Sequence, residues 1–133
     1  DRELLRLRIK FFPLTLGPMR QLTKRGMRLK EALEKEGKTV IETYPGATQD
    51  ILGIPRKGRG IDKLVEGLRL TGISGVKDDM TGDELDAVSC ALAGIMYLKG
   101  EYSAIGDPGE MLMILPPLPQ DWADRKSPKH KRA

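Results

Sequence analysis

We expect this chain to fold as one α/β domain, and three stretches of the sequence predict that class. Residues 38–44 are rich in β-branched side chains and are typical of a strand. Residues 83–98 carry small and apolar side chains nearly all round, which predicts a helix buried against a sheet. Residues 103–115 hold two short apolar runs around a Pro-Gly pair, which predicts a hairpin.

The first half of the chain is predicted to contain one helix and one strand. Apolar or small residues recur at steps of three and four over residues 19–33, which predicts an amphipathic helix that Gly37 ends as a C-cap. The strand at 38–44 follows and stops at Pro45. We expect residues 46–60 to form a loop that can hold a short helical turn at residues 48–52.

The second half begins with a short amphipathic helix at residues 61–70, followed by a polar connection over residues 71–80. Thr81 and Glu84 have the spacing of a capping box, so the long helix should begin between them. The hairpin at 103–115 completes the predicted fold.

Composition places the chain among globular proteins and excludes several classes of function. It is 39% apolar and 32% charged, has no apolar run long enough to cross a membrane, and shows no signal peptide. Its single cysteine, Cys90, excludes an intrachain disulfide and a thiolate zinc cluster. We therefore expect a cytoplasmic protein.

We expect one domain over residues 1–119 and a basic tail over residues 120–133. The ten residues from Asp124 to Ala133 hold five Lys or Arg and one Asp, which equals the whole net charge of +4. The remaining body is neutral, so the pI of about 9.3 does not by itself indicate a folded surface that binds nucleic acid.

Three acidic residues stand where a fold rarely places them without a reason. Glu42 lies in the predicted strand among apolar neighbours, and Glu is a poor strand former. Asp83 and Asp86 are three residues apart near the start of the predicted buried helix, hence on one side of it. The three carboxylates could converge on one divalent metal site, although helix capping alone also favours Asp83.

Five segments of the chain carry a resemblance to known proteins: residues 22–26, 40–45, 82–93, 105–107 and 114–116. The Asp-Glu-Leu-Asp-Ala stretch that begins at Asp83 is the most specific of them. Together they resemble the C-terminal two thirds of a family of uncharacterised proteins predicted to be RNase H-like nucleases.

The resemblance implies an RNase H-like fold, with a central mixed sheet and flanking helices. By this similarity, Glu42 takes the place of the acidic residue that ends the fourth strand. Asp83 or Asp86 takes that of the final acidic helix position. Proteins of this fold also place an essential Asp on the first strand of an N-terminal meander, and residues 1–36 contain no counterpart. We therefore expect the N-terminal strands to be missing from this chain.

The leading interpretation is a Mg²⁺- or Mn²⁺-dependent nuclease, in which Glu42, Asp83 and Asp86 serve as catalytic residues and metal ligands. The cations of a glycine-containing loop would seat the phosphate backbone of a nucleic acid. They are Arg56, Lys57 and Arg59. A non-catalytic binding or assembly module of the same fold is the alternative, and a small-molecule phosphotransferase is a third reading. The sequence leaves open DNA against RNA and the oligomeric state.

Overall fold

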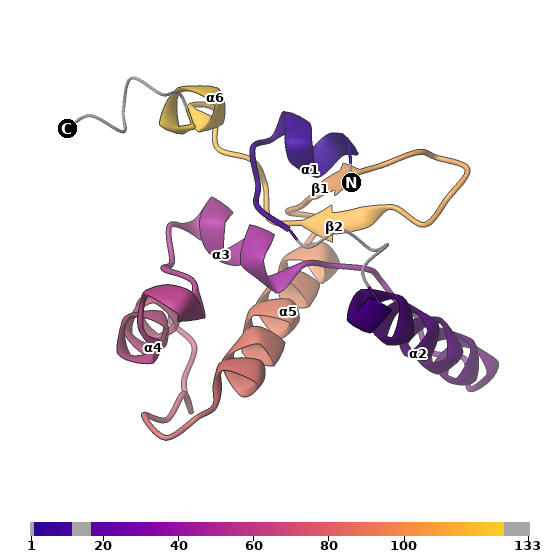
Figure 1. The fold of residues 1–133 in the computed structure, drawn as a ribbon, viewed down its shortest axis with the longest axis horizontal. Helices are drawn as coiled ribbons and strands as arrows, with labels where there is room; N and C mark the ends of the chain where they lie inside the picture. The colour runs from indigo at the N-terminus through magenta and orange to yellow at the C-terminus, as the bar shows by residue number, and fades with distance from the viewer. Residues whose placement is uncertain (1, 12–16, 127–133) are drawn as a thin grey trace.

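The structure is a computed structural model that describes residues 2–11 and 17–126, and this part of the chain is mostly helical (Figure 1). In chain order the elements are α1 (Arg2–Arg6), α2 (Gly17–Lys35), α3 (Pro45–Leu52), the 3-10 turn η1 (Lys57–Arg59), α4 (Ile61–Leu70), α5 (Gly82–Leu98), β1 (Ser103–Ile105), β2 (Met113–Leu115) and α6 (Trp122–Arg125). Figure 1 shows α5 in the middle, with α3 and α4 on one side and α2 on the other.

The predicted hairpin is confirmed, but the expected mixed sheet is reduced to it. Strands β1 and β2 pair antiparallel, with Ser103 opposite Leu115, and the Glu110 N–H closes the turn on the Asp107 carbonyl at 3.0 Å. The run 38–44 is extended rather than a strand in the described structure. Its only bridge joins Glu42 to Met113 in parallel, and β propensity without a neighbouring strand leaves the rest of the run unpaired.

Helix α3 contains the helical turn expected at residues 48–52 and is longer than expected, since it begins at Pro45. Pro45 occupies its first turn, where a missing N–H costs nothing, and Gly53 ends it in the left-handed conformation with φ 72°. These two signals mark both ends of the helix. The glycine and proline content of the segment suggested a shorter helical turn within a loop.

Helix α5 starts as predicted and is less buried than predicted. The Thr81 N–H donates to the Glu84 carboxylate at 2.9 Å and the Glu84 N–H donates to the Thr81 hydroxyl at 3.2 Å, which confirms the capping box. The helix buries one face, whose residues are Leu85, Ser89, Leu92 and Ala93. Its opposite face includes exposed Ile95 and Leu98, so the absence of charge does not mean burial on all sides.

In the part of the chain that the structure describes, the core consists of two apolar clusters that the α3 segment connects. The first gathers under α1 and the hairpin, and its buried members are Leu4, Ile9, Ala47, Ile51, Leu115 and Trp122. The second lies between α4 and α5, and its buried members are Ile54, Leu64, Val65, Leu68, Val76 and Leu85. Helix α3 gives Ala47 and Ile51 to the first cluster, and Ile54, just beyond its end, joins the second.

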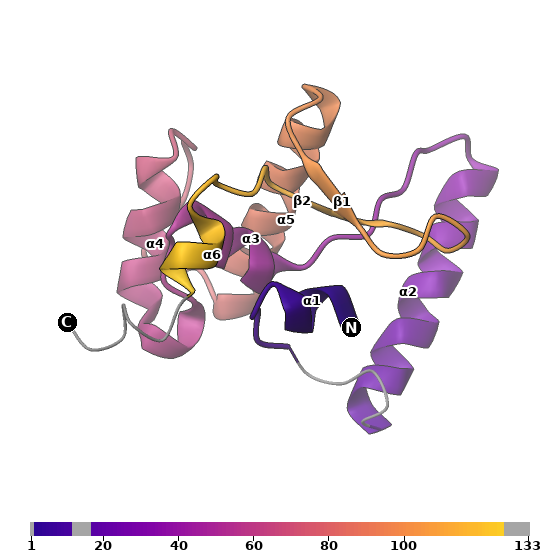
Figure 2. The same ribbon diagram turned by 90° about the horizontal axis from the view of Figure 1, so that it is seen from above.

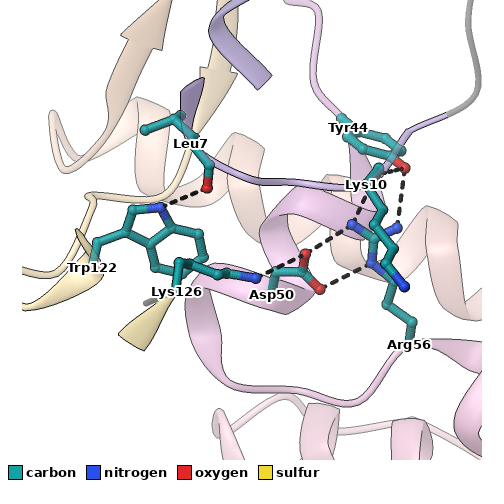
Figure 3. Close-up of polar contacts among 7 residues, drawn as sticks. All are labelled: Leu7, Lys10, Tyr44, Asp50, Arg56, Trp122 and Lys126. Carbon is teal, nitrogen blue, oxygen red and sulfur yellow. Dashed lines mark hydrogen bonds and ion pairs between the residues drawn. The ribbon is translucent and has the colours of Figure 1, made fainter. Parts of the chain in front are cut away.

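The folded body extends past residue 119, where we expected it to end. Trp122 is buried in the first cluster, and its indole N–H donates to the Leu7 carbonyl at 3.1 Å (Figure 3). The C-terminal segment is therefore anchored through Lys126. The predicted basic tail beyond that point lies outside the described residues. Among the described residues, no helix is long and apolar enough to cross a membrane.

Candidate metal and phosphate site

The first turns of α5 hold a pair of carboxylates around one cation. The aliphatic stem of Lys57 lies across Gly82, where an added Cβ would meet the Lys57 Cδ at 2.8 Å. The Lys57 ammonium then lies 3.1 Å from Asp83 Oδ1 and 3.0 Å from Asp86 Oδ2. The spacing of the two acids thus places them on one side of the helix, as predicted.

Of the two carboxylates, Asp86 makes the stronger ion pair with Lys57. Its side chain is 23% exposed, against 95% for Asp83, so water screens the contact to Asp83 far more. Hydrogen bonds from the ammonium raise the pKa of Lys57 above its ordinary value, and the bond to Asp86 contributes more than the bond to Asp83.

Cys90, one turn further along α5, has a thiol whose pKa is raised. Burial is the larger cause and the charge of Asp86 the smaller one. The thiol is therefore a poor nucleophile at neutral pH.

A buried amide fixes Asp86 from the opposite side. The Gln49 side chain, in α3, is 1% exposed and donates from Nε2 to Asp86 Oδ1 and to Ser89 Oγ, at 2.9 Å each. The Ser89 hydroxyl donates in turn to the Leu85 carbonyl at 3.0 Å. Sequence reasoning missed Gln49 and Ser89, because the contact joins residues 37 apart and nothing in the spacing signals it.

Glu42 does not join this pair. Its backbone carbonyl accepts a hydrogen bond from the Ile114 N–H at 2.7 Å, so the residue anchors the extended segment beside β2. Over residues 2–11 and 17–126, no three His, Cys, Asp or Glu side chains come together in a group that could hold a metal ion. The expected convergence of Glu42, Asp83 and Asp86 is therefore absent from the described structure. The predicted strand end and helix start would meet if a sheet brought them together, and the described residues form only a two-stranded hairpin.

Arg56, one of the three cations expected to bind phosphate, instead directs its guanidinium to groups within the protein. Its guanidinium binds both oxygens of Asp50, at 2.9 and 2.8 Å, and also donates to the Tyr44 hydroxyl and the Lys10 carbonyl (Figure 3). Gly46 allows this placement, since an added Cβ would lie 2.9 Å from the Arg56 Cζ. Burial opposes the charge on Arg56, but the bonds to Asp50 and Tyr44 outweigh it, and the net effect raises its pKa.

The other two cations of the loop differ from each other. Lys57 is held by the two α5 carboxylates. Arg59 is exposed and, among the described residues, takes part in no side-chain hydrogen bond or ion pair. Arg59 is thus the cation of the three best placed to meet a phosphate from solution.

Comparison with known proteins does not assign this chain to a family. Neither the protein-family models, nor the curated proteins, nor the solved structures give a match to this chain. Function must therefore be inferred from the chemistry of the site.

Asp83 and Asp86 are hard oxygen donors, but within the described residues these two carboxylates alone fall short of a metal site. Asp83 and Asp86 already converge on a single positive charge, and carboxylate oxygens are the ligands that Mg²⁺ and Mn²⁺ prefer. A two-metal centre needs further carboxylates to bridge and complete both ions. Within the described residues, the pair has no third acidic partner.

Proposed function

We propose that this chain is the metal-binding part of a Mg²⁺- or Mn²⁺-dependent nuclease with an RNase H-like fold. The observation that carries the proposal is the convergence of Asp83 and Asp86 on one cation position, from which a divalent cation would have to displace the Lys57 ammonium. The two carboxylates meet at one cation position, and they do so beside a glycine-containing basic loop.

Gln49, Asp86 and Asp83 each have a task in this proposal. Gln49 holds Asp86 in a fixed orientation, which keeps one ligand from having to reorganise when a cation binds. Asp83, nearly fully exposed, supplies the second oxygen from the solvent side. When bound, the divalent cation would stabilise negative charge on the phosphate and acidify a water molecule.

The proposed RNase H-like fold draws on two features of the structure. The extended segment at Glu42 runs parallel to β2, and α5 packs against β2, as expected for one edge of a sheet covered by a helix. A further acidic ligand would have to come from outside the residues described here. Glu42 remains a candidate ligand only if additional strands draw the extended segment into a sheet.

Asp86→Asn is the substitution that tests this function. It keeps the size of the side chain and removes the charge that a divalent cation requires. We expect Mg²⁺- or Mn²⁺-dependent cleavage of single- or double-stranded nucleic acid to fall at least about 100-fold, as when a group that stabilises transition-state charge is removed. Binding of Mn²⁺, followed by titration calorimetry, should weaken in parallel.

Asp62→Asn is the matched control, because Asp62 is an exposed acid in the first turn of α4. It should change neither cleavage nor Mn²⁺ binding. Chelator should silence the wild-type protein. Mn²⁺ binding that survives Asp86→Asn unchanged would contradict the proposal.

The alternative is a non-catalytic binding or assembly module. One observation favours it: Lys57 neutralises the carboxylate pair within the protein, as a structural ion pair joining η1 to α5 would. If this alternative holds, Asp86→Asn lowers the free energy of unfolding, and the wild-type protein shows no metal-dependent cleavage. Activity and metal affinity measured side by side separate the two functions.

A further inference from the structure

Helix α2 is a long helix without a packed face. None of its 19 residues is buried in the described structure, and Leu22 and Leu29 are 58% and 60% exposed. Figure 2 shows α2 along one side of the molecule, away from α3 and α4. Helices in proteins draw most of their stability from an apolar face packed against another element. The apolar residues of α2 therefore indicate a surface that a partner covers.

The apolar residues of α2 form a seam with heptad spacing. The steps along the seam are three, four, three and four residues, which is the pattern of a and d positions in a coiled coil. Its members are Met19, Leu22, Gly26, Leu29 and Leu33. Gly26 lies at the centre, and apart from its chain neighbours and the backbone of its own helix, nothing lies within 4 Å of the position that its Cβ would take. The middle of the seam is thus open for close approach by another helix.

The charges of α2 are arranged against its own macrodipole. Residues 19–30 contain five Lys or Arg and no acid, whereas residues 31–36 contain three Glu and one Lys. Cations near a helix N-terminus and carboxylates near its C-terminus are both unfavourable. A neighbouring helix of opposite direction and the same sequence sets the acidic half of one helix beside the basic half of the other.

We propose that α2 pairs antiparallel with α2 of a second copy of this chain, forming a homodimer through the heptad seam. A parallel pair would place the basic halves against each other, with Arg25 of one copy against Lys30 of the other, and the antiparallel pair avoids this repulsion. In this arrangement Leu29 of one copy fills the space over Gly26 of the other, and Leu22 meets Leu33 of the other. The flanking Arg25 then faces the small Ala32 of the second copy, so no like-charged pair is forced together.

Two substitutions with equal exposure and different positions test the interface. Leu29 lies on the seam and Met27, which is 63% exposed, lies off it. Leu29→Glu should raise the dimer dissociation constant about tenfold or more, because a charge then occupies the centre of the interface. Met27→Glu adds the same charge on the outer face and should leave the constant within about twofold. Sedimentation equilibrium measures both, and circular dichroism checks that the helices persist.

Cysteine pairing tests the direction of the helices in a Cys90→Ser background. Protein with Leu22→Cys mixed with protein with Leu33→Cys should form a disulfide-linked dimer, whereas Leu22→Cys alone should not. Crosslinking of Leu22→Cys with itself would indicate parallel helices and overturn the proposal. A monomer at every concentration reached, or a dimer that Leu29→Glu leaves intact, would also overturn it and point to a different partner on the seam.

Discussion

Asp50 is the residue that ties together the most distant parts of this fold. Its carboxylate binds Arg56 through two oxygens and lies 3.7 Å from the Lys126 ammonium near the C-terminal end of the described chain. Through Arg56 the same network reaches Tyr44 and the Lys10 carbonyl (Figure 3). Both side chains of the main pair are largely shielded from water, so this contact is stronger than an ordinary surface pair.

Replacing Arg56 by lysine tests whether the network needs a guanidinium or only a positive charge. Arg56→Lys keeps the charge but cannot hold both Asp50 oxygens together with Tyr44 and the Lys10 carbonyl. We expect it to lower the free energy of unfolding by about 1–3 kcal/mol, measured by urea denaturation. Arg59→Lys, in the same loop but exposed, should change stability by less than about 0.5 kcal/mol. Equal stability of the two variants would mean that the network contributes nothing measurable.

At the scale of the site, the proximity of Asp83 and Asp86 could be predicted from the sequence, and little else could. Their spacing on one helix fixes their proximity whatever the tertiary fold. The partners Gln49 and Lys57 come from other segments, and long-range contacts of this kind leave no local pattern. Arg56 was expected to bind phosphate because it lies beside glycines, but its guanidinium donates hydrogen bonds to Asp50 and Tyr44.

At the scale of elements, local signals fixed where helices begin and end better than what they pack against. The predicted helix 61–70 coincides with α4, and Gly37 follows α2 with φ 78° as the expected C-cap. Strand formation depends on a partner, so the β-branched run 38–44 remained extended with a bridge at Glu42. Burial of α5 depends on the number of its neighbours, which its uncharged sequence does not specify.

The capping box of α5 should have a measurable effect on stability. Thr81→Ala removes the acceptor for the Glu84 N–H and should cost about 1 kcal/mol of unfolding free energy. Thr23→Ala makes the same change inside the exposed helix α2 and should be neutral or slightly stabilising, since Ala is the better helix former. Urea denaturation of both proteins compares the two. A Thr81→Ala protein as stable as the wild type would show that solvent caps the helix equally well.

At the scale of the whole molecule, the two ends of the described chain stabilise each other. Trp122 packs with Leu4 and Ile9, residues more than 100 positions away in the sequence, and Arg8 donates to the Lys126 carbonyl at 2.7 Å. The Pro-rich stretch before Trp122 suggested the end of the body. Burial of a large aromatic side chain outweighs that local signal, because it removes much apolar surface from water.

Trp122→Ala should therefore loosen both ends together. We expect a loss of about 3 kcal/mol in unfolding free energy, typical of a large core aromatic replaced by alanine. Hydrogen exchange should show faster exchange of the α1 amides as well as of α6. Tyr102→Ala, which removes a ring that is 40% exposed, should cost much less and leave α1 unaffected. Unchanged protection of α1 in Trp122→Ala would show that the two ends are not coupled.

The burial of Trp122 also gives the molecule an internal optical reporter. It is the chain's sole tryptophan, and its ring sits against the apolar first cluster, with the Lys126 ammonium 4.8 Å from its centroid. Its emission thus follows the docking of the C-terminal segment, while the far-ultraviolet signal comes from α2, α4 and α5. Helix loss without an emission change would report melting confined to helices remote from Trp122, and the reverse order would report release of the chain end from an otherwise intact body.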